Sequence, residues 1–188
     1  MLKLLTAPLL AASLLMAGPA FAQQKLLPAQ SEIVFTSRQL GVPVEGRFKR
    51  FDAQLSFDPK KPEAGRIDFT VDLTSASLGA AEVEAELVKP EWFHTARFPQ
   101  ARFVSRSIKA LGGGRFEVSG QLSLKGTARD LVVPVALSQT GGTTTASGQF
   151  TLQRLAFKIG DGEWADTSMV ANEVQVRFKL ALTGVPAL

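Results

Sequence analysis

The sequence contains no cysteine among its 188 residues. This absence excludes disulfide bonds, thiolate metal sites, a cysteine nucleophile and lipidation on a cysteine. A chain of this length can bury a hydrophobic core that stabilises it without cross-links. Its composition, 45% hydrophobic and 20% charged residues, is typical of one globular domain.

Tyrosine is also absent, whereas phenylalanine occurs 13 times and tryptophan twice. Proteins that bind sugars or other polar ligands often use the phenol hydroxyl of tyrosine, which this chain lacks. Its aromatic side chains therefore supply apolar surface.

Long hydrophobic runs are confined to the N-terminus. Lys3 precedes an apolar run over residues 4–17, and residues 20–22 read Ala-Phe-Ala, an A-x-A cleavage signal. Because the run is too short for a membrane span, residues 1–22 are predicted to be a cleaved secretory signal peptide. The alternative is an uncleaved anchor. Residues 23–188 then form the mature domain, which we expect to be soluble in the periplasm.

Runs of one charge sign are missing as well. The formal net charge is +4, and Lys and Arg are interspersed with Asp and Glu. A nucleic-acid-binding surface would gather its basic residues on one face, so no nucleic-acid partner is expected. A membrane surface and a homodimer both stay open as partners.

What the chain does contain is a strand pattern, seen best in residues 173–183. Every second residue there is apolar, and side chains of a strand alternate between its two faces, so one face is apolar and the other meets water. The apolar positions of this segment are Val174, Val176, Phe178, Leu180 and Leu182. Similar alternation occurs over residues 31–39, 42–48, 51–57, 66–74, 102–109, 115–125, 131–137 and 143–157.

These strands predict an all-β fold with a single short helix. Residues 80–89 are rich in Ala and Glu with apolar residues at helical spacing, so they predict a helix that ends at Pro90. The alternation slips between Phe48 and Phe51, which predicts a bend or bulge near residues 49–50. Eight or nine long antiparallel strands favour an up-and-down barrel, because closure removes exposed edges.

Catalytic patterns are scarce. His94 is the only histidine, so a Ser–His–Asp apparatus would need it, yet no serine elbow lies nearby. The acidic loop with Asp161, Glu163 and Asp166 is typical of a turn, and Gly112–Gly114 is typical of a hairpin. We therefore expect no enzyme activity, no metal and no cofactor, and a hydrolase that uses His94 remains the alternative.

The inside of an eight-stranded barrel is either filled by side chains or holds one small ligand. Two features favour a cavity here. Long strands make a tall barrel, and the small residues Gly46, Ala53 and Gly120 interrupt the inward apolar rows. The alternative is an interior that Phe and Leu fill completely.

Five motifs, in their order and spacing, resemble the YceI family of periplasmic lipocalin-like proteins. They cover most of the mature chain: VEGRF at 44–48, WFH at 92–94, FPQARF at 98–103, VSGQLSLKGT at 118–127 and RLAFKIG at 154–160. The family pattern has Phe-Gly where this chain has Phe157 and Lys158. This departure places a long cation beside the expected rim of the barrel.

The resemblance implies an extended eight-stranded antiparallel lipocalin-like β-barrel that encloses a polyisoprenoid, an isoprenoid quinone or a fatty-acid-like lipid. Phe side chains would line it, Trp92, Phe93 and Trp164 would lie near an opening, and His94 and Arg154 would contact a polar head. The expected ligand-binding residues are Phe35, Phe48, Phe69, Trp92, Phe93, His94, Phe103, Phe150, Arg154, Phe157, Trp164 and Phe178.

The expected function is non-enzymatic binding of such an amphiphile for transport, storage or sequestration. Residues 160–172 also look like the family branch that accompanies membrane b-type cytochromes. The second hypothesis is therefore a periplasmic interaction or stress-related module that partners a membrane cytochrome without carrying lipid.

Overall fold

The computed structural model describes residues 23–188, so the predicted signal peptide lies outside the described residues. These residues form nine strands of six or more residues, two strands of two residues and one α-helix, α1, at Ala81–Leu87. The all-β prediction with a single short helix is confirmed. The strands are β1 Lys25–Leu26, β2 Glu32–Gln39, β3 Val42–Phe48, β4 Phe51–Ser56, β5 Arg66–Asp72, β6 Ala76–Ser77, β7 Gln100–Gly112, β8 Arg115–Leu124, β9 Thr127–Thr140, β10 Thr143–Gln153 and β11 Glu173–Thr183.

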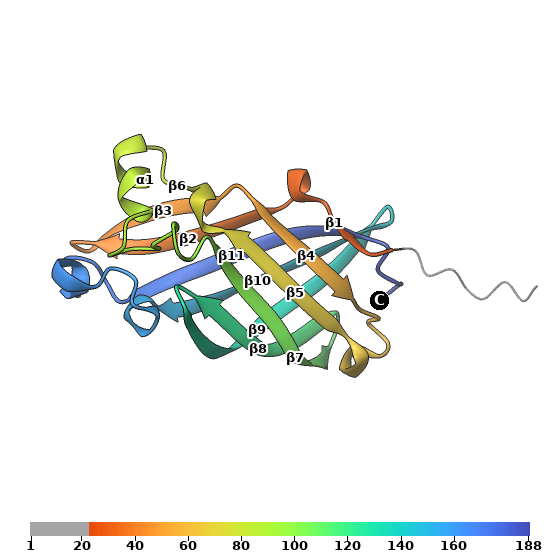
Figure 1. Cartoon of the computed structure of the whole chain (residues 1–188). Helices are drawn as coiled ribbons and strands as arrows, with labels where there is room; N and C mark the ends of the chain where they lie inside the picture. The colour runs from red at the N-terminus through yellow and green to blue at the C-terminus, as the bar shows by residue number, and fades with distance from the viewer. Residues whose placement is uncertain (1–22) are drawn as a thin grey trace, which may run out of the picture.

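All eleven strands belong to one antiparallel sheet that curls into a half-barrel (Figure 1). Its order is β4-β5-β7-β8-β9-β10-β11-β2-β3-β6, and β1 pairs with the end of β11. The order begins at β4 and ends at β6, with no ladder between these strands in the described residues. The sheet therefore encloses an interior without a continuous ring of backbone hydrogen bonds.

The predicted bend after Phe48 is present. β3 ends at Phe48 and β4 begins at Phe51. Between them, the Lys49 N–H donates to the Ser75 carbonyl (3.1 Å) and the Arg50 N–H donates to Ser75 Oγ (3.0 Å). The bend places β4 at one edge of the sheet and β3 near the other, so these two strands do not pair although they are consecutive in the chain.

Three strands differ in length from the prediction by four residues or more, and one of them, β7, runs over Gln100–Gly112 instead of 102–109. β9 runs over Thr127–Thr140 instead of 131–137, because its first four residues are polar or small and carry no apolar alternation. β10 ends at Gln153 instead of 157, since Arg154–Phe157 form a 3₁₀ turn, η4. That turn leads into residues 158–172, the connection to β11.

Buried residues gather at both ends of the half-barrel. At the end away from α1, Phe57, Ile108, Phe116 and Val118 form one cluster. Near α1 a larger cluster includes Leu73, Ala76, Leu87, Phe93, Ala101, Leu122, Leu124, Phe157 and Ile159.

The one α-helix in the described part of the chain, α1, has seven residues, and no helix there has the length and apolar character that a membrane span needs.

Candidate ligand-binding cavity

A cavity of about 600 Å³ lies between these two ends, inside the curled sheet. Inward-facing side chains of β2–β5 and β7–β11 line it, together with α1 and the connections at residues 92–93 and 154–170. Only five of its lining residues are polar or charged: Ser37, Gln39, Glu82, Glu86 and Arg154. The cavity therefore suits a ligand that is mostly hydrocarbon.

Eleven of the twelve residues predicted to bind ligand line the cavity, and His94 is the exception. The His94 N–H donates to the Lys89 carbonyl (2.9 Å) and its carbonyl accepts from the Phe98 N–H (2.9 Å). Its ring packs edge-on against Phe98, with centroids 5.8 Å apart. His94 therefore builds the turn after α1 and lies outside the cavity lining, and its contact with a ligand head stays a prediction.

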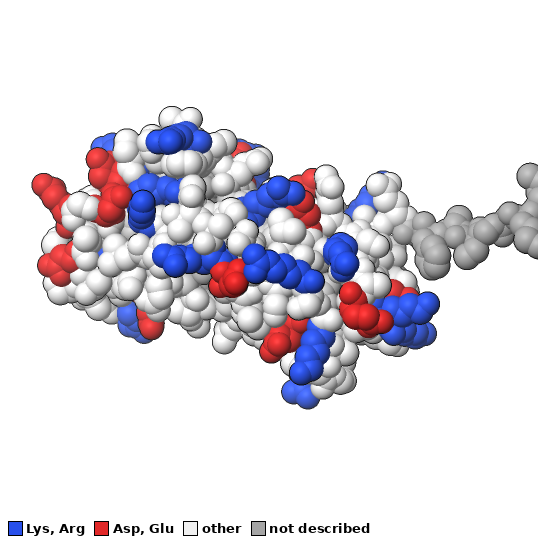
Figure 2. Space-filling view, turned by 60° about the horizontal axis from the view of Figure 1, so that its bottom comes forward, with Lys and Arg blue, Asp and Glu red and all other residues white. Residues whose placement is uncertain are grey.

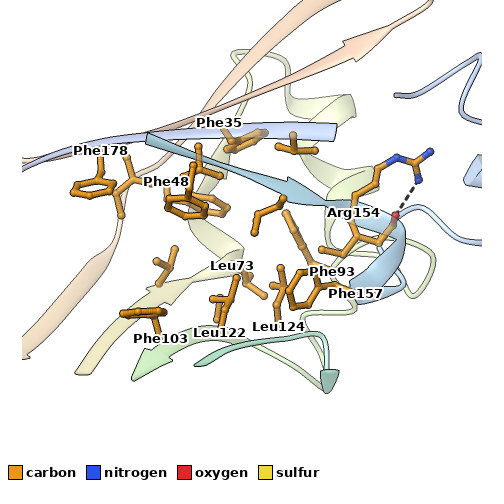
Figure 3. A pocket seen from close by; sticks show the side chains of 18 of the residues that line it. Phe35, Phe48, Leu73, Phe93, Phe103, Leu122, Leu124, Arg154, Phe157 and Phe178 are labelled. Carbon is orange, nitrogen blue, oxygen red and sulfur yellow. Dashed lines mark hydrogen bonds between the residues drawn. The ribbon is translucent and has the colours of Figure 1, made fainter. Parts of the chain in front are cut away.

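The phenylalanine rings of the wall lie against glycines of neighbouring strands. A Cβ added at Gly46 would lie 2.3 Å from Phe35 Cζ, and one at Gly148 would lie 2.6 Å from Phe178 Cζ. A Cβ added at Gly120 would likewise lie 2.6 Å from Phe103 Cζ. Each ring occupies the volume that a side chain on the next strand would need, so the rings line the wall and leave the centre open (Figure 3).

This finding refines the role expected for the small residues. Gly46 and Gly120 do not leave gaps, since the rings of Phe35 and Phe103 fill those positions. Ala53 lines the cavity directly. The glycines enlarge the interior indirectly, by letting large rings lie against the backbone.

Side-chain burial agrees with a hollow centre. The lining rings of Phe35, Phe69 and Phe150 are only partly buried. Phe57 and Phe116, at the end away from α1, are 9% and 5% exposed and touch edge to face, with centroids 5.3 Å apart. The interior is thus closely packed around Phe57 and Phe116, where a second cavity measures about 60 Å³, and the larger cavity lies in the middle.

The cavity meets solvent at the end that carries α1. Among its lining residues, the exposed ones are Gln39 at the end of β2 and Glu82, Val83 and Glu86 on α1. Figure 1 shows this helix above the ends of β2 and β3. Sequence reasoning did not assign these four residues to the site, although Glu82 and Glu86 are four apart and so share one face of the helix.

Glu84 anchors α1 at this opening. Its Oε1 accepts hydrogen bonds from Ser77 Oγ (2.8 Å), the Leu78 N–H (3.0 Å) and the Gly79 N–H (3.1 Å). These bonds, led by that from Ser77, lower the pKa of the Glu84 carboxyl below its ordinary value. The helix is therefore fixed by a carboxylate as well as by the buried Leu87.

Arg154 lines the cavity with its stem, while its guanidinium points away from the apolar side chains (Figure 3). The residue is 3% exposed, and burial lowers the pKa of its guanidinium from the ordinary value. Five hydrogen bonds of 2.6–3.0 Å use the five N–H groups of an arginine. Their acceptors are the carbonyls of Ile159, Gly160, Trp164, Val170 and Ala171.

Arg154 thus holds the 158–172 connection in place and has no N–H group left for a polar head. The expectation of a headgroup contact is corrected to this structural role. The same connection is held by Lys125, a residue 8% exposed, which donates to the carbonyls of Glu91 (3.1 Å) and Lys158 and contacts Asp161 (3.5 Å). Two buried cations therefore hold the connection that forms this part of the cavity wall.

Lys158, the departure from the YceI pattern, is exposed and does not line the cavity. Its backbone is left-handed, with φ 56° and ψ 33°, where it caps η4. Glycine adopts that conformation without the steric penalty of a Cβ atom. A glycine at position 158 would therefore avoid that penalty.

Trp92 and Trp164 both line the cavity, and their ring centroids are 5.5 Å apart. They come from the turn after α1 and from η5 (Gly162–Ala165), at the end where the cavity opens. Phe93, predicted to lie near the opening with them, also lines the cavity and is buried. Within residues 23–188, no three His, Asp or Glu residues lie close enough together to hold a metal.

Comparison with known proteins gives concordant matches. A family model, the YceI-like domain, matches residues 25–182. A protein of Shewanella denitrificans named UPF0312 is 34% identical over 137 residues, covering 71% of this chain and 72% of its own length. The crystal structure of Burkholderia cenocepacia BcnA matches with a TM-score of 0.80 and 42% identity, over 83% of this chain and 98% of its own.

A more distant structure has the same fold. It is a polyisoprenoid binding domain from Saccharophagus degradans, implicated in plant cell wall breakdown, with a TM-score of 0.68 and 18% identity over 87% of this chain and 99% of its own. The family model covers nearly all of the described residues. The chain belongs to the YceI-like family.

Proposed function

We propose that this protein binds one long-chain amphiphile in its cavity and carries, stores or sequesters it in the periplasm without catalysing a reaction. The ligand is a polyisoprenoid, an isoprenoid quinone or a fatty-acid-like lipid. The observation that supports this proposal is an apolar cavity whose exposed lining residues all lie at one end. A chain can lie inside while its head stays near water.

The size of the cavity suits this role. Its volume of about 600 Å³ falls within the range of about 300–1,000 Å³ usual for small-molecule sites. Burying about 500 Å² of hydrocarbon contributes roughly 12 kcal/mol before the costs of association. Those costs are about 4–15 kcal/mol, which leaves an affinity that permits both loading and release.

The family match adds support for the ligand class. The Saccharophagus domain with the same fold is described as binding polyisoprenoid. The cavity of this chain has the apolar lining that such a molecule needs. The alternative, an interaction module for a membrane cytochrome, gives this cavity no role.

The two tryptophans make a direct binding assay available. Trp92 and Trp164 are the only tryptophans in the sequence and both line the cavity. Titration of delipidated protein with oleyl alcohol should therefore change tryptophan emission and saturate at one ligand per chain. If emission and calorimetric heat both stay unchanged up to the solubility limit of the ligand, the proposal is wrong.

Export has its own test. Intact mass and N-terminal sequencing of the protein recovered from a periplasmic fraction should give a chain that begins at Gln23. A full-length chain retained in the membrane or the cytoplasm would contradict the periplasmic part of the proposal.

A further inference from the structure

Few of the residues that line the cavity are charged. Three charged residues line it: Glu82, Glu86 and Arg154. All five N–H groups of Arg154 are donated to main-chain carbonyls of the wall. A ligand therefore finds no free cationic donor at Arg154, whereas the two carboxylates are exposed at the opening.

Nearby lysines do not supply the cavity with a free cation. Lys125 is buried, with its Nζ bonded to two carbonyls and Asp161, and it is not part of the cavity lining. Lys89 forms an exposed ion pair with Glu86 (2.5 Å) outside the lining. Lys158 is exposed and also outside it. Among the described residues, no lysine lines the cavity.

The position of a ligand head follows from the cost of burying polar groups. A polar head left without hydrogen bonds in an apolar interior is unfavourable, so the head lies at the opening while the chain lies inside. The polar groups available there are the carboxylates of Glu82 and Glu86 and the neutral side chains of Ser37 and Gln39. Figure 2 shows further acidic side chains at the tip of this end.

We propose that the cavity selects amphiphiles whose head carries no negative charge, and that Glu82 and Glu86 set this selectivity. This inference rests on the proposed function. A carboxylate or phosphate head meets like charge at the opening, and the one cation among the lining residues, Arg154, has no free N–H group to compensate it. A hydroxyl or amide head can donate hydrogen bonds to the same carboxylates. Glu82 has the larger effect, because Lys89 partly offsets Glu86.

The test uses ligands that share one hydrocarbon chain and differ only in the head. Oleyl alcohol, oleamide and oleate are titrated separately into delipidated protein at neutral pH and low salt, with tryptophan emission as the readout. We expect the alcohol and the amide to bind about tenfold or more tightly than oleate. The ratio should shrink as salt is raised, because opposing charges at an exposed site are screened.

Two double variants have the same change in net charge. Comparing them separates the effect of the carboxylates at the opening from the effect of the net charge of the protein. Glu82→Gln/Glu86→Gln removes both carboxylates of the opening and should reduce the alcohol-to-oleate ratio to about threefold or less. Glu63→Gln/Glu117→Gln removes two carboxylates outside the lining and should leave the ratio unchanged. Melting curves of both variants verify that they fold.

The outcomes distinguish this inference from the function on which it rests. Oleate that binds as tightly as oleyl alcohol, or a ratio that Glu82→Gln/Glu86→Gln leaves unchanged, overturns the selectivity while supporting the lipid-binding function. Failure of all three ligands to bind contradicts the proposed function itself, and the selectivity with it.

Discussion

The two ends of the half-barrel are closed by different chemistry. At the end away from α1, Phe57 and Phe116 meet edge to face and bury Ile108 and Val118 beside them. At the α1 end, polar groups hold the wall, which includes residues 154–172 and α1. Arg154 and Lys125 donate to carbonyls, and Glu84 accepts from the N–H groups of Leu78 and Gly79. The cavity lies between a packed end and a hydrogen-bonded end.

We infer that the packed end stays closed, whereas the hydrogen-bonded end can open far enough for a ligand to pass. Direct packing of rings leaves no route without creating a cavity, which is costly. Hydrogen-bonded segments can exchange their partners for water, so local opening costs less than global unfolding. The exposed lining residues occur only at the hydrogen-bonded end, and we expect the ligand to enter there.

The largest effect is expected at the hydrogen-bonded end. Arg154→Leu keeps an apolar stem but leaves five main-chain carbonyls without their donor. Each buried carbonyl left without a hydrogen bond costs about 1–3 kcal/mol, so the free energy of unfolding should fall by about 3 kcal/mol or more, which chemical denaturation can measure. The control, Arg106→Leu, removes an exposed ion pair with Asp130 and should cost about 1 kcal/mol or less. Equal losses in the two variants would show that Arg154 does not hold the wall.

The packed end and the hollow middle should respond differently to the same truncation. Phe116→Ala removes a ring that is 5% exposed and should cost about 3–5 kcal/mol in the free energy of unfolding. Phe150→Ala removes a partly buried ring that faces the cavity and should cost about 1–2 kcal/mol. Denaturation of ligand-free protein compares them. A loss at Phe150 as large as that at Phe116 would contradict a hollow middle.

Gly46 offers a way to narrow the cavity from its wall. The three atoms closest to an added Cβ all belong to the Phe35 ring, at 2.3–2.9 Å, so Gly46→Ala displaces this ring. We expect oleyl alcohol to bind about tenfold more weakly, with a stability loss of about 1–2 kcal/mol.

The control adds Phe35→Leu to Gly46→Ala, which removes the ring and should restore most of the affinity. If affinity stays unchanged in Gly46→Ala, the position of the Phe35 ring does not determine the size of the cavity.

Acid should loosen α1 before it affects the packed end. A carboxyl whose pKa is lower in the folded state stabilises the fold above its ordinary pKa, 4.5 for Glu84, and this contribution is lost as pH falls through the lowered value. The amide NMR shifts of Leu78 and Gly79, which donate to this carboxylate, should therefore change below pH 4.5 while those of Phe57 and Phe116 do not. In Glu84→Gln the acid-dependent step should be missing, and its persistence there would assign it to another group.

The smallest effect concerns Lys158. Its left-handed backbone costs a residue with a Cβ more than it costs glycine, so Lys158→Gly should raise the free energy of unfolding by about 0.5–1 kcal/mol. Ligand binding should not change, because Lys158 does not line the cavity. A destabilising result in urea denaturation would indicate that its side chain has a structural role.

Much of this architecture could be predicted from alternation, because a half-buried strand shows its faces in sequence. Val174, Val176 and Phe178 were expected inside, and all three line the cavity. The bend near Lys49 was visible as a slip in phase. Strand ends without apolar residues, such as the start of β9, gave no such signal.

The roles of the polar residues could not be predicted in this way. Arg154 and His94 are polar residues beside apolar runs, and a headgroup contact was a reasonable expectation for both. Which carbonyls lie within reach of Arg154 depends on the path of residues 159–171, which no local pattern specifies. The exposed position of Glu82 and Glu86 at the opening depends likewise on where Glu84 anchors α1.

Native mass spectrometry of the protein as isolated, without delipidation, tests the central claim most directly. The account predicts one long-chain molecule of apolar character on each folded chain, released by organic extraction and regained on incubation with oleyl alcohol. A chain that is ligand-free as isolated and stays so in excess amphiphile would contradict it.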